Sequence, residues 1–199
     1  LLLERDADGW ITRILDLDDD AEVPAGAAIE SWMHVEIDRV TEAQGAEIAR
    51  NLQAVLADVH AAVDDSPETY ALIRRLADQL TADPGQFGRD ASSEAGDLLR
   101  WLADGNFLIL GHLALSANDL ASPARIPLQD AHGVLRRGNI TISPLELLPA
   151  YRSGAPLVIF KSPLISTVQR SARYDCLTVV TPATGPDDGQ MIHVFLGLF

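Results

Sequence analysis

The sequence predicts an α/β fold of the α+β kind, built from two small sandwich modules. Several segments alternate apolar and polar residues with period two, as half-buried strands do, and others repeat apolar residues at helical spacing. Charge is uneven: residues 1–100 carry 22 acidic and 8 basic side chains, whereas residues 101–199 carry 7 of each. This change in composition predicts a join between two modules near residue 90.

The first module is expected to span residues 1–82 in the order strand, strand, helix, helix. "GWITRILDL" (9–17) and Ile29–Arg39 alternate as strands do. A helix should start at Thr41 and stop at "DDSPE" (64–68), where Ser66 and Pro67 form the N-cap and first position of the next helix. Helical spacing predicts that each helix buries one stripe, namely Ile48, Leu52, Val55, Leu56, Val59 and Val63, then Tyr70, Ile73, Leu76, Ala77 and Leu80.

A linker rich in Gly and Pro is expected at 83–91, followed by a second module at 92–199. This module should begin with a helix from about Ser93 and turn at "DGN" (104–106). Four strands should follow, forming an antiparallel sheet with flanking helices. Their sequences are "FLILGHLAL", "PLVIFK", "YDCLTVVT" and "MIHVFLGLF", the last two joined by the polar hairpin loop "PATGPDDGQ".

The composition limits the partners and the compartment. A formal charge of −14 opposes binding to nucleic acid or to an anionic membrane. A single cysteine, Cys176, excludes an internal disulfide and fits a cytoplasmic protein. No run of apolar residues is long enough to span a bilayer. The chain starts without Met and stops within a strand pattern, so we expect a segment of a longer protein.

"SWMHVEIDRV" (31–40) places His34, Glu36 and Asp38 on one face of a predicted strand. Alternate residues of a strand lie about 6.7 Å apart, so His34 and Asp38, about 13 Å apart, cannot share one metal ion. The favoured interpretation is a surface that faces water, an effector or a neighbouring module.

Cys176 could in principle form a thiolate–imidazole pair with His112, His132 or His193. Cys176 lies in an apolar strand, however, where a free cysteine ordinarily packs as a small apolar residue. A structural role is therefore favoured over catalysis.

Three basic residues are candidates for contact with an effector or an interface. Arg170 and Arg173, in "STVQRSAR", could hold a carboxylate or phosphate, and Lys161 ends a strand, where its side chain reaches water. The sequence contains no dinucleotide-binding, P-loop, nucleophile-elbow or zincin motif. We therefore predict no catalytic residue, no metal and no cofactor in this segment.

Three phrases in order resemble the N-terminal region of the large bacterial NAD-specific glutamate dehydrogenases. They are "SWMHVEIDR" (31–39), "LLRWLADGNFLILG" (98–111) and "PLVIFKSPLISTVQR…FLGLF" (156–199). The chain departs from the family after Gly111, where a Tyr-Arg-Glu run is usual. It also departs at Gln169, where the family has His, and at "KSPLIST", which is less polar than its counterpart.

The resemblance implies an ACT-like module at 1–82 and a PAS-type or ACT-like module at 92–199, with the catalytic domain and its NAD elsewhere. The leading hypothesis is a non-catalytic regulatory and assembly segment of an enzyme that converts L-glutamate and NAD to 2-oxoglutarate, ammonia and NADH. Expected partners are the remaining domains, further subunits of a homo-oligomer and an amino-acid effector. The alternative is a free-standing amino-acid sensor; least favoured is a hydrolase using Cys176 or a metal on His34, Glu36 and Asp38.

Overall fold

The computed structural model describes residues 1–15, 23, 26–121, 130–181 and 189–199. Its contacts divide the chain into two compact units, Leu1–Gly45 and Ala46–Phe199, which are described separately below. The assignment of 1–82 to an ACT-like module and of 92–199 to a PAS-type module stays a prediction.

The first unit contains a three-stranded antiparallel sheet in the order β2-β1-β3, made of β1 (Leu2–Arg5), β2 (Ile11–Leu15) and β3 (Ala27–Ile29). The Asp6 side chain accepts hydrogen bonds from the backbone of Asp8 and Trp10 and so closes the β1–β2 turn. Strand β2 confirms the predicted strand over Ile11–Leu15 of "GWITRILDL", whereas Asp16 and Leu17 lie outside the described residues. Strand β1 was not predicted, although Leu2 and Leu3 are its buried residues.

The prediction of a strand over Ile29–Arg39 is wrong. Strand β3 ends at Ile29, and the residues from Glu30 to Thr41 have no regular secondary structure. Every side chain from Ser31 to Val40 is exposed, and no described strand pairs with this segment. An alternating pattern becomes a strand only where a neighbouring strand and a buried face are available.

The predicted helix break at 64–68 is also wrong, because one helix, α1, runs from Glu42 to Ala82 with Pro67 inside it. Proline removes one backbone hydrogen bond within a helix, the one to the carbonyl four residues earlier. The residues after Pro67 compensate by burial: Ile73, Ala77 and Leu80 are 0% exposed. The Thr69 hydroxyl also donates to the Asp65 carbonyl at 2.8 Å.

The two apolar stripes of α1 differ. The stripe after Pro67 is confirmed, with Ile73, Leu76, Ala77 and Leu80 buried and Tyr70 half-buried. The stripe before it is not buried as predicted, because Ile48, Leu52 and Val63 are 44%, 55% and 63% exposed. Helical periodicity alone therefore did not distinguish the covered half of α1 from the uncovered half.

The second unit is built on a five-stranded antiparallel sheet in the order β5-β4-β8-β7-β6. The four predicted strands are confirmed, and the two-residue β5 was not predicted. The strands are β4 (Leu108–Ser116), β5 (His132–Gly133), β6 (Leu157–Ile165), β7 (Arg173–Thr181) and β8 (Met191–Leu198). Most of the predicted β7–β8 loop lies outside the described residues.

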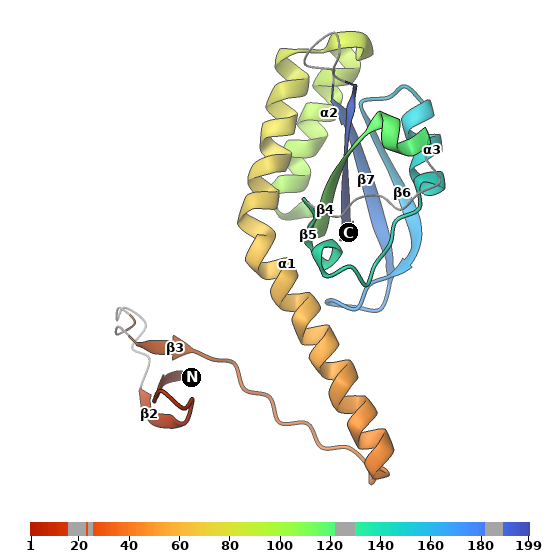
Figure 1. Ribbon diagram of the computed structural model, residues 1–199. Helices are drawn as coiled ribbons and strands as arrows, with labels where there is room; N and C mark the ends of the chain where they lie inside the picture. Colours follow the sequence, from red (N-terminus) through yellow and green to blue (C-terminus); the bar gives the residue numbers. More distant parts are fainter. Residues whose placement is uncertain (16–22, 24–25, 122–129, 182–188) are drawn as a thin grey trace. The chain divides into compact units, whose positions relative to one another are not determined.

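Helices lie on both faces of this sheet (Figure 1). Besides α1 they are α2 (Arg89–Trp101) and α3 (Pro144–Arg152), with short helical turns η1 (Gly85–Phe87), η2 (Leu102–Asn106), η3 (Ala117–Ala121) and η4 (Val134–Arg137). Helix α2 and the later half of α1 pack on one face, where Leu99 and Leu80 meet Val179 and Phe195. On the other face Leu147 of α3 packs with Tyr174 and Cys176. Strand β7 is therefore buried on both faces.

Polar contacts fix α1 to the rest of the second unit. Asp58, which is 2% exposed, forms an ion pair with Arg137 at 2.5 Å and accepts a hydrogen bond from the Thr167 hydroxyl at 2.8 Å. One turn before Thr69, Asp65 accepts from the backbone N–H of Gly133 at 2.6 Å. These contacts set the position of α1 along the β4–β5 edge of the sheet.

Candidate functional site

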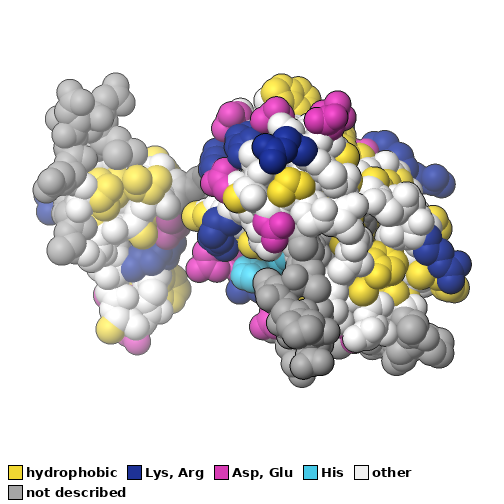
Figure 2. Space-filling model, turned by 90° about the horizontal axis from the view of Figure 1, so that it is seen from above, with side chains coloured by type: hydrophobic (Ala, Val, Ile, Leu, Met, Phe, Trp, Pro, Cys, Tyr) yellow, Lys and Arg dark blue, Asp and Glu magenta, His cyan; other side chains and the backbone are white. Residues whose placement is uncertain are grey.

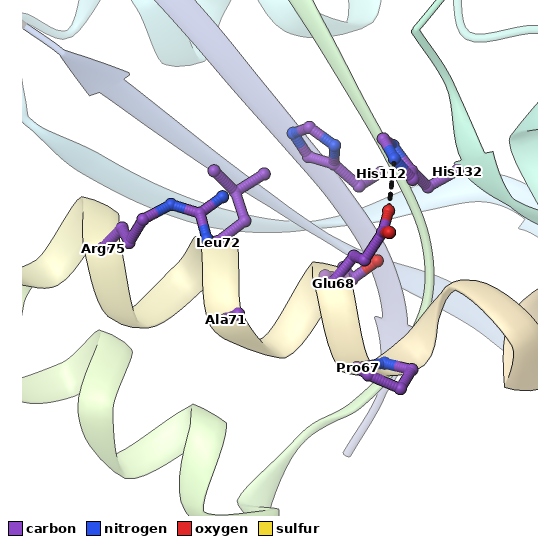
Figure 3. Close-up of a pocket in the computed structure, with 8 residues that line it drawn as sticks. Pro67, Glu68, Ala71, Leu72, Arg75, His112 and His132 are labelled. Carbon is purple, nitrogen blue, oxygen red and sulfur yellow. Dashed lines mark ion pairs between the residues drawn. The ribbon is translucent and has the colours of Figure 1, made fainter.

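A cleft of about 440 Å³ opens between α1 and the β4–β5 edge of the sheet (Figure 3). Its volume lies within the usual range for small-molecule sites. The lining residues come from one stretch of α1 and from two strands: Pro67, Glu68, Thr69, Ala71, Leu72 and Arg75, with His112 and His132.

No helix among the described residues combines the length and the apolar character needed to cross a lipid bilayer.

The helical repeat places the α1 side chains of the cleft. Glu68, Leu72 and Arg75 stand at positions i, i+4 and i+7, which lie on one side of a helix. Figure 3 shows all three side chains on the side of α1 that faces the strands carrying His112 and His132. The cleft therefore has a carboxylate, an aliphatic side chain and a guanidinium in a row.

Three histidines lie close together on the same side of the sheet. His112 on β4 stands opposite His132 on β5, and the two ring centroids are 5.7 Å apart. His112 Nε2 is 3.2 Å from Nδ1 of His193 on β8, and the two rings stack. The ring of Phe195 packs against His112 with a centroid distance of 4.7 Å.

Two of these imidazoles are neutral at physiological pH. Burial, together with the nearby His193 and His132, lowers the pKa of His112 to about 3. Burial also lowers the pKa of His193 to about 4. The hydrogen bond between the two rings is therefore a neutral one, in which one nitrogen donates and the other accepts.

His132 connects the histidine group to α1. Its Nε2 lies 3.6 Å from a carboxylate oxygen of Glu68, shown by the dashed line in Figure 3. Its Nδ1 is buried and has no hydrogen-bond partner among the described residues. A buried ring nitrogen without a partner is costly, and bound ligands or water commonly satisfy such groups.

Gly133 allows His132 to take this position. Its φ of +62° is a conformation that residues with a Cβ rarely adopt, and a Cβ there would lie 2.1 Å from the Leu110 carbonyl oxygen. Only glycine lets β5 approach β4 so closely. The His132–Gly133 pair is thus a local requirement of the cleft.

The structure places the predicted basic residues on other parts of the second unit. Lys161 forms an ion pair with the buried Asp175 at 2.7 Å. The Arg170 guanidinium donates a hydrogen bond to the Phe199 carbonyl. Arg173 opens β7 and is exposed. Their role as effector or interface residues stays a prediction.

His34, Glu36 and Asp38 are all exposed on the segment that follows β3. His34 Nε2 and Glu36 Oε1 are 3.4 Å apart, and both side chains are almost fully exposed. Across the described ranges, no three His, Cys, Asp or Glu side chains are grouped so that they could hold a metal ion. The prediction that these residues face an effector or a module remains untested.

Cys176 is not paired with a histidine in this structure. It is 1% exposed in the cluster that contains Tyr174, on the face of the sheet opposite to His112 and Phe195. Burial, together with the negative charge of Glu146, raises the pKa of its thiol to about 12. The thiolate needed for nucleophilic attack is therefore strongly disfavoured.

The sequence interpretation missed the α1 side of the cleft. It treated the histidines only as partners for Cys176, and it assigned no role to Glu68 or Arg75. The available signal was the i, i+7 spacing of Glu68 and Arg75 beside a Leu. That spacing is common on exposed helices, so it does not identify a site without the facing strands.

On the face of the second unit that Figure 2 shows, acidic and basic side chains are interspersed. The described residues of that face therefore form no extensive basic surface of the kind that binds nucleic acid.

Comparisons with known proteins place the N-terminal part of the chain. Residues 1–52 match the family model described as the glutamate dehydrogenase ACT1 domain. Over 85 residues the chain is 40% identical to the NAD-specific glutamate dehydrogenase of Mycobacterium tuberculosis, a match that covers 42% of this chain and 5% of that enzyme. The N-terminal region of this chain is therefore related to NAD-specific glutamate dehydrogenase, with an ACT1 domain at residues 1–52.

Proposed function

We propose that the chain is a non-catalytic regulatory and assembly segment of an NAD-dependent glutamate dehydrogenase. The main observation behind this proposal is the match of residues 1–52 to the ACT1 domain. The 40% identity to an NAD-specific glutamate dehydrogenase supports it. The parent enzyme converts L-glutamate and NAD to 2-oxoglutarate, ammonia and NADH, and its catalytic domain binds the NAD. The other domains and further subunits of a homo-oligomer are its partners.

Two features of the second unit support a binding role over a hydrolytic one. The cleft at α1 is lined by charged, imidazole and apolar side chains, as small-molecule sites are. Cys176, the one cysteine, has a pKa raised to about 12 and so cannot serve as a thiolate nucleophile near neutral pH.

The coding sequence beyond Phe199 tests the proposal directly. A continuing reading frame that encodes a dinucleotide-binding domain supports the dehydrogenase. A stop codon after Phe199 contradicts it and favours the second candidate, a free-standing amino-acid sensor, for which the cleft is the specific observation.

An enzyme assay tests the non-catalytic role. We expect the purified 199-residue chain to form no NADH from L-glutamate and NAD, under conditions in which the parent enzyme does so. Measurable turnover by the chain alone would contradict the proposal.

A further inference from the structure

We propose that the cleft between α1 and the β4–β5 edge binds a free α-amino acid as its zwitterion, with the ammonium group at Glu68 and the carboxylate at Arg75. As the effector site of a dehydrogenase segment this inference rests on the proposed function, whereas the binding itself is a property of the second unit.

The charges of the cleft point to a ligand that carries both signs. Arg75 has no ion-pair partner among the described residues, whereas its neighbour Arg74 pairs with Asp104. Among the described residues that line the cleft, Glu68 is the one that carries a carboxylate. A simple anion would meet the Glu68 carboxylate, and a simple cation would meet the Arg75 guanidinium. A zwitterion is complementary to both side chains. The cleft should therefore select zwitterions, because a simple anion or cation would be repelled by the side chain of like charge.

The buried histidines His112 and His193 add no further charge to that of Glu68 and Arg75. Because burial lowers the pKa of His112 and of His193 far below 7, neither ring brings a positive charge near the cleft. Of these two rings, His112 lines the cleft and forms a polar but uncharged part of its wall. A neutral wall beside one fixed positive and one fixed negative charge favours a ligand with no net charge.

The spacing of the two charged side chains suits an α-amino acid. Side chains on a helix lean toward its N-terminus, so the guanidinium of Arg75 approaches the level of Leu72, next to which Figure 3 shows it. Leu72 lies four residues after Glu68, about 6 Å along the helix axis. The ammonium and carboxylate groups of an α-amino acid are attached to one carbon. They can therefore span this distance with a charge-assisted hydrogen bond at each end.

The remaining lining residues give the amino acid's side chain an apolar surface. Pro67, Ala71 and Leu72 offer only carbon atoms to a ligand, and they lie on the same stretch of α1 as the charged pair. The cleft of about 440 Å³ has room for a medium-sized apolar side chain and ordered water. His132, through its Nε2 contact with Glu68, orients the carboxylate that receives the ammonium group.

Calorimetric titration of the intact 199-residue chain tests the inference. Each common L-amino acid is titrated separately, up to about 10 mM, a concentration that nearly saturates a site with a millimolar Kd. The N-acetyl and the amide derivatives of the tightest binder are then titrated. We expect one saturable site for the amino acid, and at least about a tenfold weaker Kd for each derivative, because each removes one charge-assisted hydrogen bond.

Variants locate the site. Arg75→Gln and Glu68→Gln should each weaken the Kd by about tenfold or more. Arg50→Gln and Glu47→Gln, at exposed positions of the same helix, are matched controls that should leave it unchanged. Circular dichroism of every variant checks that it folds.

Three outcomes would overturn the inference: no amino acid binds the folded chain, the N-acetyl derivative binds as well as the parent amino acid, or the control variants weaken binding as much as the cleft variants. None of these results depends on dehydrogenase activity. Failure of the binding site and failure of the proposed function are therefore separable.

Discussion

The two compact units both contain antiparallel sheets, yet they differ in how their apolar side chains are covered. In the first unit Trp10, Ile14 and Ile29 lie on or beside the strands and are 74%, 63% and 63% exposed. In the second unit Val179 and Phe195 are 0% exposed, because helices pack on both faces of the sheet. The contrast shows that covering elements, rather than the strand pattern, decide how much burial stabilises each unit.

The largest difference between the units should come from placing a charge at one apolar position in each. Val179→Asp puts a carboxylate between helices and sheet, and we expect a loss of about 4 kcal/mol or more in the free energy of unfolding. Val35→Asp, at a position that is 77% exposed, should change it by less than about 0.5 kcal/mol. Urea unfolding followed by circular dichroism measures both, and equal losses would refute the contrast.

Ion pairs give the next comparison. Asp58→Ala leaves Arg137 partly buried without its partner and frees the Thr167 hydroxyl, so we expect a loss of about 3 kcal/mol. In the first unit the Arg5 guanidinium holds the pKa of Glu30 at about 2, with the Trp32 N–H and other contacts contributing.

Glu30→Gln is the matched change in the first unit. The Arg5–Glu30 pair is exposed, where water screens the attraction, so this variant should cost less than Asp58→Ala in the same urea experiment. An equal or larger cost for Glu30→Gln would show that exposure does not govern the strength of these pairs.

Acid should destabilise the second unit through its buried histidines. The folded-state pKa of His112, about 3, lies below the unfolded value of 6.5, so the unfolded chain binds the additional proton. Stability is fully present above pH 6.5 and is lost as the pH falls toward the folded pKa. Between about pH 7 and pH 5, His112 should contribute a loss of up to about 2 kcal/mol.

Substitution of single histidines isolates this effect. His112→Phe should flatten the pH dependence of the urea midpoint, whereas His34→Phe, at an exposed position, should not. An unchanged slope in His112→Phe would show that His112 is not buried in its neutral form.

The smallest and most local expected effect concerns alkylation of the Cys176 thiol. Because burial raises the pKa of Cys176 to about 12, iodoacetamide should react with the native chain far more slowly than with the urea-unfolded chain. Mass spectrometry of the modified fraction checks this at neutral pH. A fast native reaction would mean that β7 opens readily, so that the second unit is no better protected than the first.

Sequence patterns predicted the strands of the second unit well, because β4, β7 and β8 are central and apolar on both faces. They failed at "SWMHVEIDRV", where alternation is present but no described strand pairs with the segment. They also failed at Pro67, because proline is a strong local signal and the burial of Ile73 and Leu80 that outweighs it comes from distant residues.

The cleft could not be predicted for a related reason. Glu68 and His132 are far apart in the sequence, and they meet only because Gly133 lets a two-residue strand pair with β4. Neither His132 nor Glu68 belongs to a recognisable motif. The resemblance to the N-terminal region of the dehydrogenases, in contrast, was readable from phrases of the sequence and is confirmed.

The continuity of α1 has a practical consequence for protein expression. A recombinant fragment cut at the Gly- and Pro-rich stretch, starting at residue 92, would discard Ile73, Ala77 and Leu80, which share a core with Val179 and Phe195. The apolar face of the sheet that these residues cover would then be exposed to water, and we expect such a fragment to aggregate. Cloning from Ala46 onward keeps this layer of α1 and the ion pair between Asp58 and Arg137 in one fragment.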